Sequence, residues 1–236
     1  MNKKLPKLIE LCPIVDAIME IRFKTQTHSN AVFGIIYSKL STEFKNVENL
    51  PILQIPEPIR NSDPSLKSQP LYKIFDDEFV IQIGPEVLSI SSYPTYVGWK
   101  RFSNKINSIL DKIEELKIIT QVDRLGIRYI NFFEQNIFNK INLNINLSGK
   151  EFNDEISTFR TQVTTGKFIS TLQISNDATS NDKRGSIIDI DCHKTTGLQD
   201  FFRNKKELIN EGHLKEKELF FSILSDDFLN ELKPKY

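Results

Sequence analysis

The clearest signal in the sequence is an apolar residue at every second position of a segment near the N-terminus. Over residues 15–23 every second side chain is apolar, and Asp16, Glu20 and Arg22 fall on the intervening positions. A period of two places alternate side chains on opposite faces of a β-strand. The pattern therefore predicts a strand with one face toward a core and one charged face.

Two segments show the three- and four-residue spacing of an amphipathic helix. The first begins at Ser29 or Asn30, either of which can cap a helix, and runs to about Phe44. The second begins after Thr95, includes Trp99 in its apolar stripe, and runs to about residue 116. Each helix is expected to bury its stripe against a sheet.

Further strands are predicted from short runs of β-branched and aromatic residues bounded by turn residues. They cover residues 71–75, 79–90, 117–133, 141–147, 155–165, 167–175 and 186–193. Five prolines between residues 51 and 70 predict a loop, and Gly84-Pro85 predicts a bend. The polar residues 176–185 predict a turn, and a helical tail is expected after Gly197.

The connections between these elements are mostly of hairpin length, which favours antiparallel pairing. We therefore expect an α+β fold with mostly antiparallel sheets packed by helices, two sheet-bearing halves and a helical C-terminal tail. Polar residues at 134–140 suggest a boundary between residues 1–134 and 141–236, although one continuous domain is an alternative.

Composition excludes several classes of function. Lys plus Arg and Asp plus Glu are equal at 31 each, so no overall field favours nucleic acid or an anionic membrane. No apolar run reaches the length of a membrane-spanning helix, and the basic start lacks the apolar segment of a signal peptide. The two cysteines, Cys12 and Cys192, form no disulfide framework or zinc motif. A cytoplasmic location is expected.

The strand at 117–133 contains the first candidate site. Arg124, Gly126 and Arg128 share one face, and two guanidinium groups beside a bare backbone position could bind a phosphate or carboxylate. Glu20 and Arg22 share a face of their own strand and are included in this anion-binding candidate. The alternative is a structural one, in which the arginines pair with the chain's own acids, for example Arg128 with Glu20.

A weaker metal-binding candidate lies in the late strand. Asp189, Asp191 and His193 share one face, and carboxylates with an imidazole could bind a divalent ion. Their spacing spreads them over ~13 Å of strand, so one ion could not reach all three. The alternative is a solvated strand face, and no metal or other cofactor is predicted.

Established catalytic motifs are absent from the sequence. The three histidines, His28, His193 and His213, form no paired metal spacing, and there is no nucleophile elbow, P-loop or dinucleotide fingerprint. His213 falls within the expected tail helix, where a packing or capping role is favoured over a basic one. The chain is therefore more readily interpreted as a non-enzyme than as an enzyme.

Several segments in order resemble a sporadically distributed family of uncharacterised bacterial proteins. The matching segments are Pro13–Phe23, Trp99, Arg124–Asn131, Ile187–Asp191, His213 and Phe221. Cys12 departs from the pattern, which has a second proline there. The family has no established activity, but its patchy distribution implies an accessory role, such as one in a mobile-element or phage-defence locus.

Three functions are carried forward from the sequence. The first is an accessory interaction or ligand-sensing protein with a protein partner or a second copy of itself. The second is a binder of a small anionic or nucleotide-like ligand through Arg124 and Arg128. The third is a metal-dependent nuclease or hydrolase using Asp189 and Asp191, with Glu20 as a further carboxylate.

Overall fold

The computed structural model describes residues 5–144, 146–151 and 156–236. It confirms the expected α+β class, with antiparallel sheets packed by helices. The chain forms two compact units. Unit 1 comprises Met1–Val15, Arg128–Cys192 and His213–Tyr236, and unit 2 comprises Asp16–Ile127 and His193–Gly212. The units therefore interleave along the chain, and four long elements contribute residues to both: β2 (Ile14–Thr25), β7 (Ile119–Phe133), β12 (Lys183–Lys194) and α5 (Phe201–Ile223).

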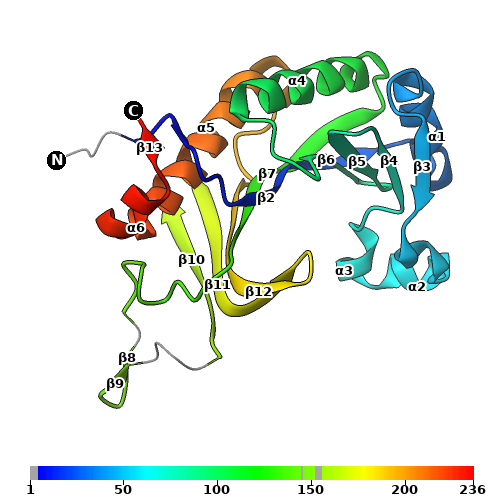
Figure 1. Ribbon diagram of the computed structural model, residues 1–236. Coiled ribbons are helices and arrows are strands. Elements are labelled where there is room, and N and C mark those ends of the chain that lie inside the picture. The colour runs from blue at the N-terminus through cyan, green and yellow to red at the C-terminus, as the bar shows by residue number, and fades with distance from the viewer. Residues whose placement is uncertain (1–4, 145, 152–155) are drawn as a thin grey trace. The chain divides into compact units, whose positions relative to one another are not determined.

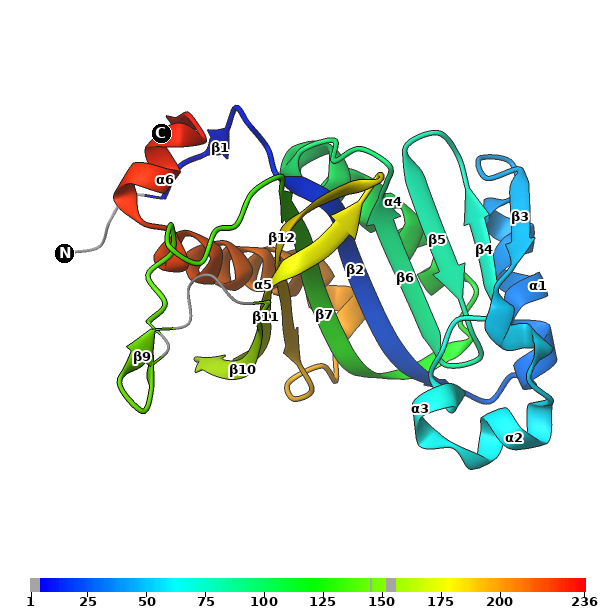
Figure 2. The same ribbon diagram turned by 60° about the horizontal axis from the view of Figure 1, so that its bottom comes forward.

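Unit 2 is built on a sheet with the strand order β7-β2-β6-β5-β4-β3 (Figure 2). Its remaining strands are β3 (Asn46–Asn49), β4 (Tyr72–Phe75), β5 (Phe79–Ile83) and β6 (Val87–Ser92). Neighbours from β2 through β6, β5 and β4 to β3 pair antiparallel. Gly84 ends β5, so the single strand expected at 79–90 is instead two strands joined by a tight turn.

The predicted alternation in β2 is confirmed. Ala17, Met19 and Ile21 are fully buried and Phe23 is 2% exposed. Helices α1 (Ser29–Leu40) and α4 (Trp99–Glu115) cover this apolar face of the sheet (Figure 1). The charged positions of β2 consequently lie on the opposite face.

The helix caps and the proline-rich segment differ from expectation. His28 caps α1 by accepting a hydrogen bond from the backbone N–H of Asn30, and Gly98, at φ +84°, precedes α4 in place of Thr95. Residues 51–70 form short helices instead of a loop, because proline is well tolerated in a first helical turn. These helices are η1 (Pro51–Gln54), α2 (Glu57–Ser62) and α3 (Pro64–Lys67).

The sheet of unit 1 has the order β10-β11-β12-β7, in which β10 is Thr158–Thr165 and β11 is Phe168–Ser180. The hairpin expected around Gly166 is present, with Gly166 at φ +63°. The next turn is much shorter than the predicted 176–185. Only Asn181 and Asp182 form it, both at positive φ, which is the two-residue geometry that suits the twist of the flanking strands.

The prediction of a strand over residues 141–147 is wrong for most of that range, and residue 145 lies outside the described residues. Ile141 forms an isolated bridge with Leu224, and only Asn146–Leu147 (β8) is extended, paired with β9 (Lys150–Glu151). Ile141 is buried, so the apolar side chain at this position anchors the segment to the core and does not mark a strand of a sheet. The start of the strand expected at 155 also lies outside the described residues.

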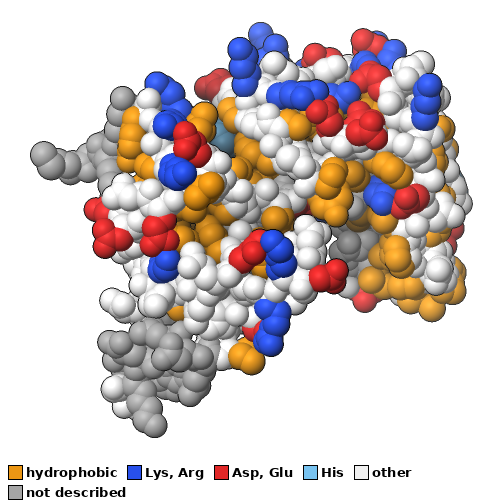
Figure 3. Space-filling model, in the orientation of Figure 1, with side chains coloured by type: hydrophobic (Ala, Val, Ile, Leu, Met, Phe, Trp, Pro, Cys, Tyr) orange, Lys and Arg blue, Asp and Glu red, His pale blue; other side chains and the backbone are white. Residues whose placement is uncertain are grey.

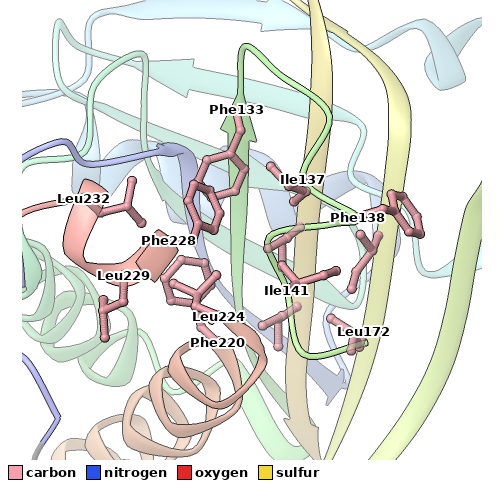
Figure 4. Packing of buried hydrophobic residues seen from close by; sticks show 13 residues of the cluster. Phe133, Ile137, Phe138, Ile141, Leu172, Phe220, Leu224, Phe228, Leu229 and Leu232 are labelled. Carbon is pink, nitrogen blue, oxygen red and sulfur yellow. The ribbon is translucent and has the colours of Figure 1, made fainter. Parts of the chain in front are cut away.

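The core of unit 1 gathers around the end of α5 and the short helix α6 (Asp226–Glu231), which Ser225 caps (Figure 4). Phe220 and Phe228 pack here against residues of the sheet. Ile137 and Phe138 also belong to this core, at 0% and 3% exposed. The segment 134–140 is therefore an integral part of unit 1 and not a linker. Two terminal strands, β1 (Leu8–Ile9) and β13 (Pro234–Lys235), pair beside it.

Charged side chains of both signs are interspersed on the surface shown in Figure 3, in keeping with the balanced composition. Among the described residues, every helix is too short or too polar to cross a lipid bilayer.

Candidate functional site

The charged face of β2 binds an arginine of β7 within unit 2. Glu20 Oε1 accepts hydrogen bonds from Arg124 Nη1 at 2.8 Å and from Arg22 Nε at 3.0 Å. The Arg124 side chain is 15% exposed, whereas that of Arg22 is 44% exposed. One carboxylate is thus shared by two guanidinium groups, and the three side chains together have a formal charge of +1.

Gly126 has a different role from the one expected. A Cβ atom at this position would lie 2.5 Å from Arg124 Nη1 and 3.1 Å from its Cζ. The guanidinium group of Arg124 therefore lies directly over the bare backbone. The missing side chain at Gly126 makes room for the chain's own arginine.

Arg128 belongs to unit 1, where it forms a bidentate ion pair with β12. Its Nε donates to Asp189 Oδ1 at 2.8 Å and its Nη2 donates to Asp189 Oδ2 at 2.5 Å. Glu20 is thus paired with Arg124 and Arg128 with Asp189, whereas the pairing of Arg128 with Glu20 stays a prediction. A two-pronged contact of this kind uses the full geometry of both groups.

The same ion pair bears on the metal-binding candidate. Both carboxylate oxygens of Asp189 accept hydrogen bonds from Arg128, so neither is directed at a shared ion with Asp191 or His193. Over residues 5–144, 146–151 and 156–236, no three His, Cys, Asp or Glu side chains are close enough together to hold a metal ion.

Sequence reasoning missed a buried polar cluster between α5 and the sheet of unit 1. The Tyr129 hydroxyl lies 3.0 Å from His213 Nδ1, and Tyr129 is 1% exposed. Burial, with a smaller contribution from Lys217, lowers the pKa of His213 to about 3. His213 is therefore neutral at physiological pH, and its Nδ1 shares a hydrogen bond with the tyrosine hydroxyl.

Glu216, one turn further along α5, is 4% exposed, and burial raises its pKa well above the ordinary value of 4.5. Cys192 on β12 is fully buried, and burial raises its pKa to about 11 despite a hydrogen bond with Ser170. A thiol with a raised pKa is a poor nucleophile at neutral pH.

A signal for this cluster was present in the sequence. Ile209, Gly212, Glu216 and Phe220 recur at helical spacing and are all buried, so Glu216 occupies an apolar stripe. An acid at a core position of a helix is an unusual feature that deserves a chemical explanation.

Two of the grooves on the surface of unit 2 are lined mainly by polar side chains. One, of about 410 Å³, lies between the start of β7 and the loop before α5, and includes Gln121 and Thr195. The other, of about 480 Å³, lies between α4 and α5 and is lined by neutral side chains with Asp111 and Lys206. Neither combines its polar groups into a recognisable reactive set.

The most distinctive surface feature is the outer edge of β10 in unit 1. Within the described part of the chain, β10 has one strand neighbour, β11. Its register runs without interruption from Thr158 opposite Ser175 to Thr165 opposite Phe168, so it contains no bulge. The strand contains four threonines, no proline, glycine or lysine, and one charged residue, Arg160.

Exposed strand edges are usually protected by lysine, proline, bulges or short length. The edge strand β3 shows such protection, because it has four residues and its Glu48 is paired with Lys73. The edge of β10 has none of these features. It therefore presents a regular row of backbone donors and acceptors to any extended segment.

Comparison with known proteins adds no assignment. A scan against protein-family models and a search of curated proteins both found no match to this chain.

Proposed function

We propose that this chain is a non-enzymatic interaction protein that binds an extended segment of a protein partner along β10. The observation that carries the proposal is the unprotected, bulge-free edge of that strand. Strand addition of this kind obtains affinity from main-chain hydrogen bonds and specificity from alternate side chains. Burial raises the pKa of the Cys192 thiol to about 11, so the thiol is not an activated nucleophile, which supports a binding role over a catalytic one.

The side chains on both faces of β10 suit such a partner. Phe159 and Val163 are half-buried, while Arg160 and Gln162 on the other face are exposed. Ile156, immediately before the strand, is 74% exposed. An added strand would cover apolar surface next to the row of backbone groups, which favours pairing.

A synthetic peptide with the sequence of residues 156–166 tests this proposal. Its binding to the ¹⁵N-labelled protein should protect the outward backbone amides of β10 from hydrogen exchange. The matched control is the same peptide with N-methyl groups along both edges, which removes the donors while keeping the side chains. Equal binding of both peptides, or exchange unchanged at β10, would refute strand addition.

A second function is favoured by the shared carboxylate of unit 2. Because Arg22 and Arg124 compete for Glu20, a small anion could bind the more exposed Arg22. Thermal-shift measurements with phosphate and with nucleotides, including cyclic ones, test this idea. Stabilisation that is lost in Arg22→Ala supports it, and an unchanged melting temperature with every anion removes it.

The resemblance to an accessory bacterial family remains part of this proposal. It adds the expectation of a cytoplasmic protein encoded in a mobile-element or phage-defence locus. An interaction role is compatible with that setting, because the family has no established activity that conflicts with such a role.

A further inference from the structure

The partner's identity can be inferred from the hydrogen-bonding pattern of β10, and this inference rests on the proposed strand addition. The loop joining β10 to β11 has two residues, Gly166 and Lys167. In a two-residue hairpin the closing pair exchanges both backbone hydrogen bonds, and narrow and wide pairs then alternate along the ladder. Thr165, Val163, Thr161 and Phe159 thus bond inward to β11.

The backbone groups of the alternate residues consequently point outward. These residues are Thr158, Arg160, Gln162 and Thr164. In an antiparallel partner strand, outward residues must face outward residues to form hydrogen-bonded pairs. For two copies of β10 related by a two-fold axis, the axis must therefore pass through a residue and not between two residues. The central positions that it can pass through are Arg160, Thr161 and Gln162.

Side chains discriminate among these registers. Centring on Arg160 places two guanidinium groups opposite one another, which is unfavourable. Centring on Thr161 or Gln162 gives the same overlap of the strands. Only the Thr161 register places Phe159 opposite the partner's Val163, and it does so at non-hydrogen-bonded pairs, where side chains approach most closely. It also places Arg160 opposite the partner's Gln162, so no like charges meet.

We propose that β10 pairs with β10 of a second copy of this chain, antiparallel, with Thr161 on the two-fold axis. The edge has one charged residue and therefore does not select an acidic or basic partner. The whole chain has a formal net charge of zero, so two copies do not repel one another. The pairing would form about eight interchain hydrogen bonds and extend the sheet across the axis.

Engineered cysteines test both the dimer and its register. Cys12 is exposed and is first replaced by serine, whereas Cys192 is buried and stays. Thr161→Cys places two thiols at a non-hydrogen-bonded pair about 4.5 Å apart between Cα atoms, within the range of a disulfide. On oxidation with glutathione disulfide it should give a covalent dimer in high yield. Gln162→Cys, the matched control, should cross-link poorly, and the reverse result would overturn the Thr161 register.

Charge substitution at the axis gives a test without oxidation. Sedimentation of the wild-type chain over about 1–100 μM should show a reversible dimer. Thr161→Lys should weaken it by roughly tenfold or more, because two ammonium groups then face each other, and Thr161→Asp should do the same. An equimolar mixture of the two variants should recover dimerisation. Circular dichroism of each variant alone establishes that it is folded.

The outcomes separate this inference from the proposed function. A wild-type chain that stays monomeric at 100 μM, with no Thr161→Cys cross-link, overturns the homodimer. If the 156–166 peptide nevertheless protects β10, strand addition survives with a different partner. If neither the peptide nor a second copy binds, both proposals fail. Gln162→Pro removes one outward donor and no bond to β11, so it should abolish both kinds of binding in a folded chain.

Discussion

Acidification from pH 7 to pH 5 should destabilise this protein through His213. The neutral imidazole is held between α5 and the sheet, where burial lowers its pKa to about 3, while in the unfolded chain it should titrate near 6.5. Between these two values only the unfolded state binds the proton. The contribution to stability is therefore fully present above about pH 6.5 and is lost as the pH falls toward 3.

The size of the effect follows from the unfolded state alone. At pH 5 the unfolded imidazole is about 1.5 pH units below its pKa, and each unit is equivalent to 1.36 kcal/mol, so the loss is about 2 kcal/mol. This value does not depend on the exact folded pKa, provided that it lies below about 4. Glu216 acts in the opposite direction, because its raised pKa destabilises the folded state as the pH increases. The raw pH dependence of the wild type therefore combines two opposing contributions.

The variant His213→Asn separates them, since asparagine does not titrate but retains an oxygen that can accept from the Tyr129 hydroxyl. Urea unfolding followed by circular dichroism at pH 5, 6 and 7 gives the free energy of unfolding of both proteins. The difference between them should shrink by about 2 kcal/mol from pH 7 to pH 5. A difference that is the same at both pH values would show that His213 is not held neutral, and would refute the reasoning.

Four further substitutions probe other parts of the structure. Glu216→Gln should stabilise the protein at pH 8 and lose that advantage at pH 5, measured by the same unfolding curves. Gly185→Ala should lower the free energy of unfolding by about 2–3 kcal/mol, because the added Cβ would collide with a backbone carbonyl of β7. Gly34→Ala should raise the free energy of unfolding by about 0.5–1 kcal/mol, because Gly34 lies in a helix with open space around it. Gly126→Ala should destabilise the wild type by displacing the Arg124 guanidinium but should be nearly neutral in an Arg124→Ala background. Additive effects in that double-mutant cycle would contradict the contact.

The anion-site hypothesis illustrates how much of a site can be predicted from alternation. Period two correctly assigned Glu20, Arg22, Arg124 and Gly126 to charged strand faces. It could not assign partners, because pairing depends on the register between strands far apart in sequence. The structure paired Glu20 with Arg124 and placed the guanidinium over Gly126, so the space expected for a ligand is occupied by the chain itself.

The opposite failure occurred at 141–147, where alternation was present but no continuous strand formed. Ile141 bonds to the end of α5 through an isolated bridge, since burial there was available and a neighbouring strand was not. The local pattern therefore identified Ile141 as a residue that would be buried, but it could not identify which other residues would bury it. The same limit applied to Glu216, because helical spacing placed it in one stripe with Ile209 and Phe220 but only the structure showed that this stripe is buried.

The sequence by itself determined the α+β class, the alternating faces of β2 and β7, the Gly166 hairpin and the helical tail. These features arise from residue spacing and turn chemistry, which act over a few neighbouring residues. Only the tertiary structure decided the interleaved units, the pairing of Arg124 with Glu20, the burial of His213 and Glu216, and the place of β10 at the end of the strand order among the described residues. All four depend on contacts between segments that are distant along the chain, and the free energy of such contacts is not encoded in any local pattern.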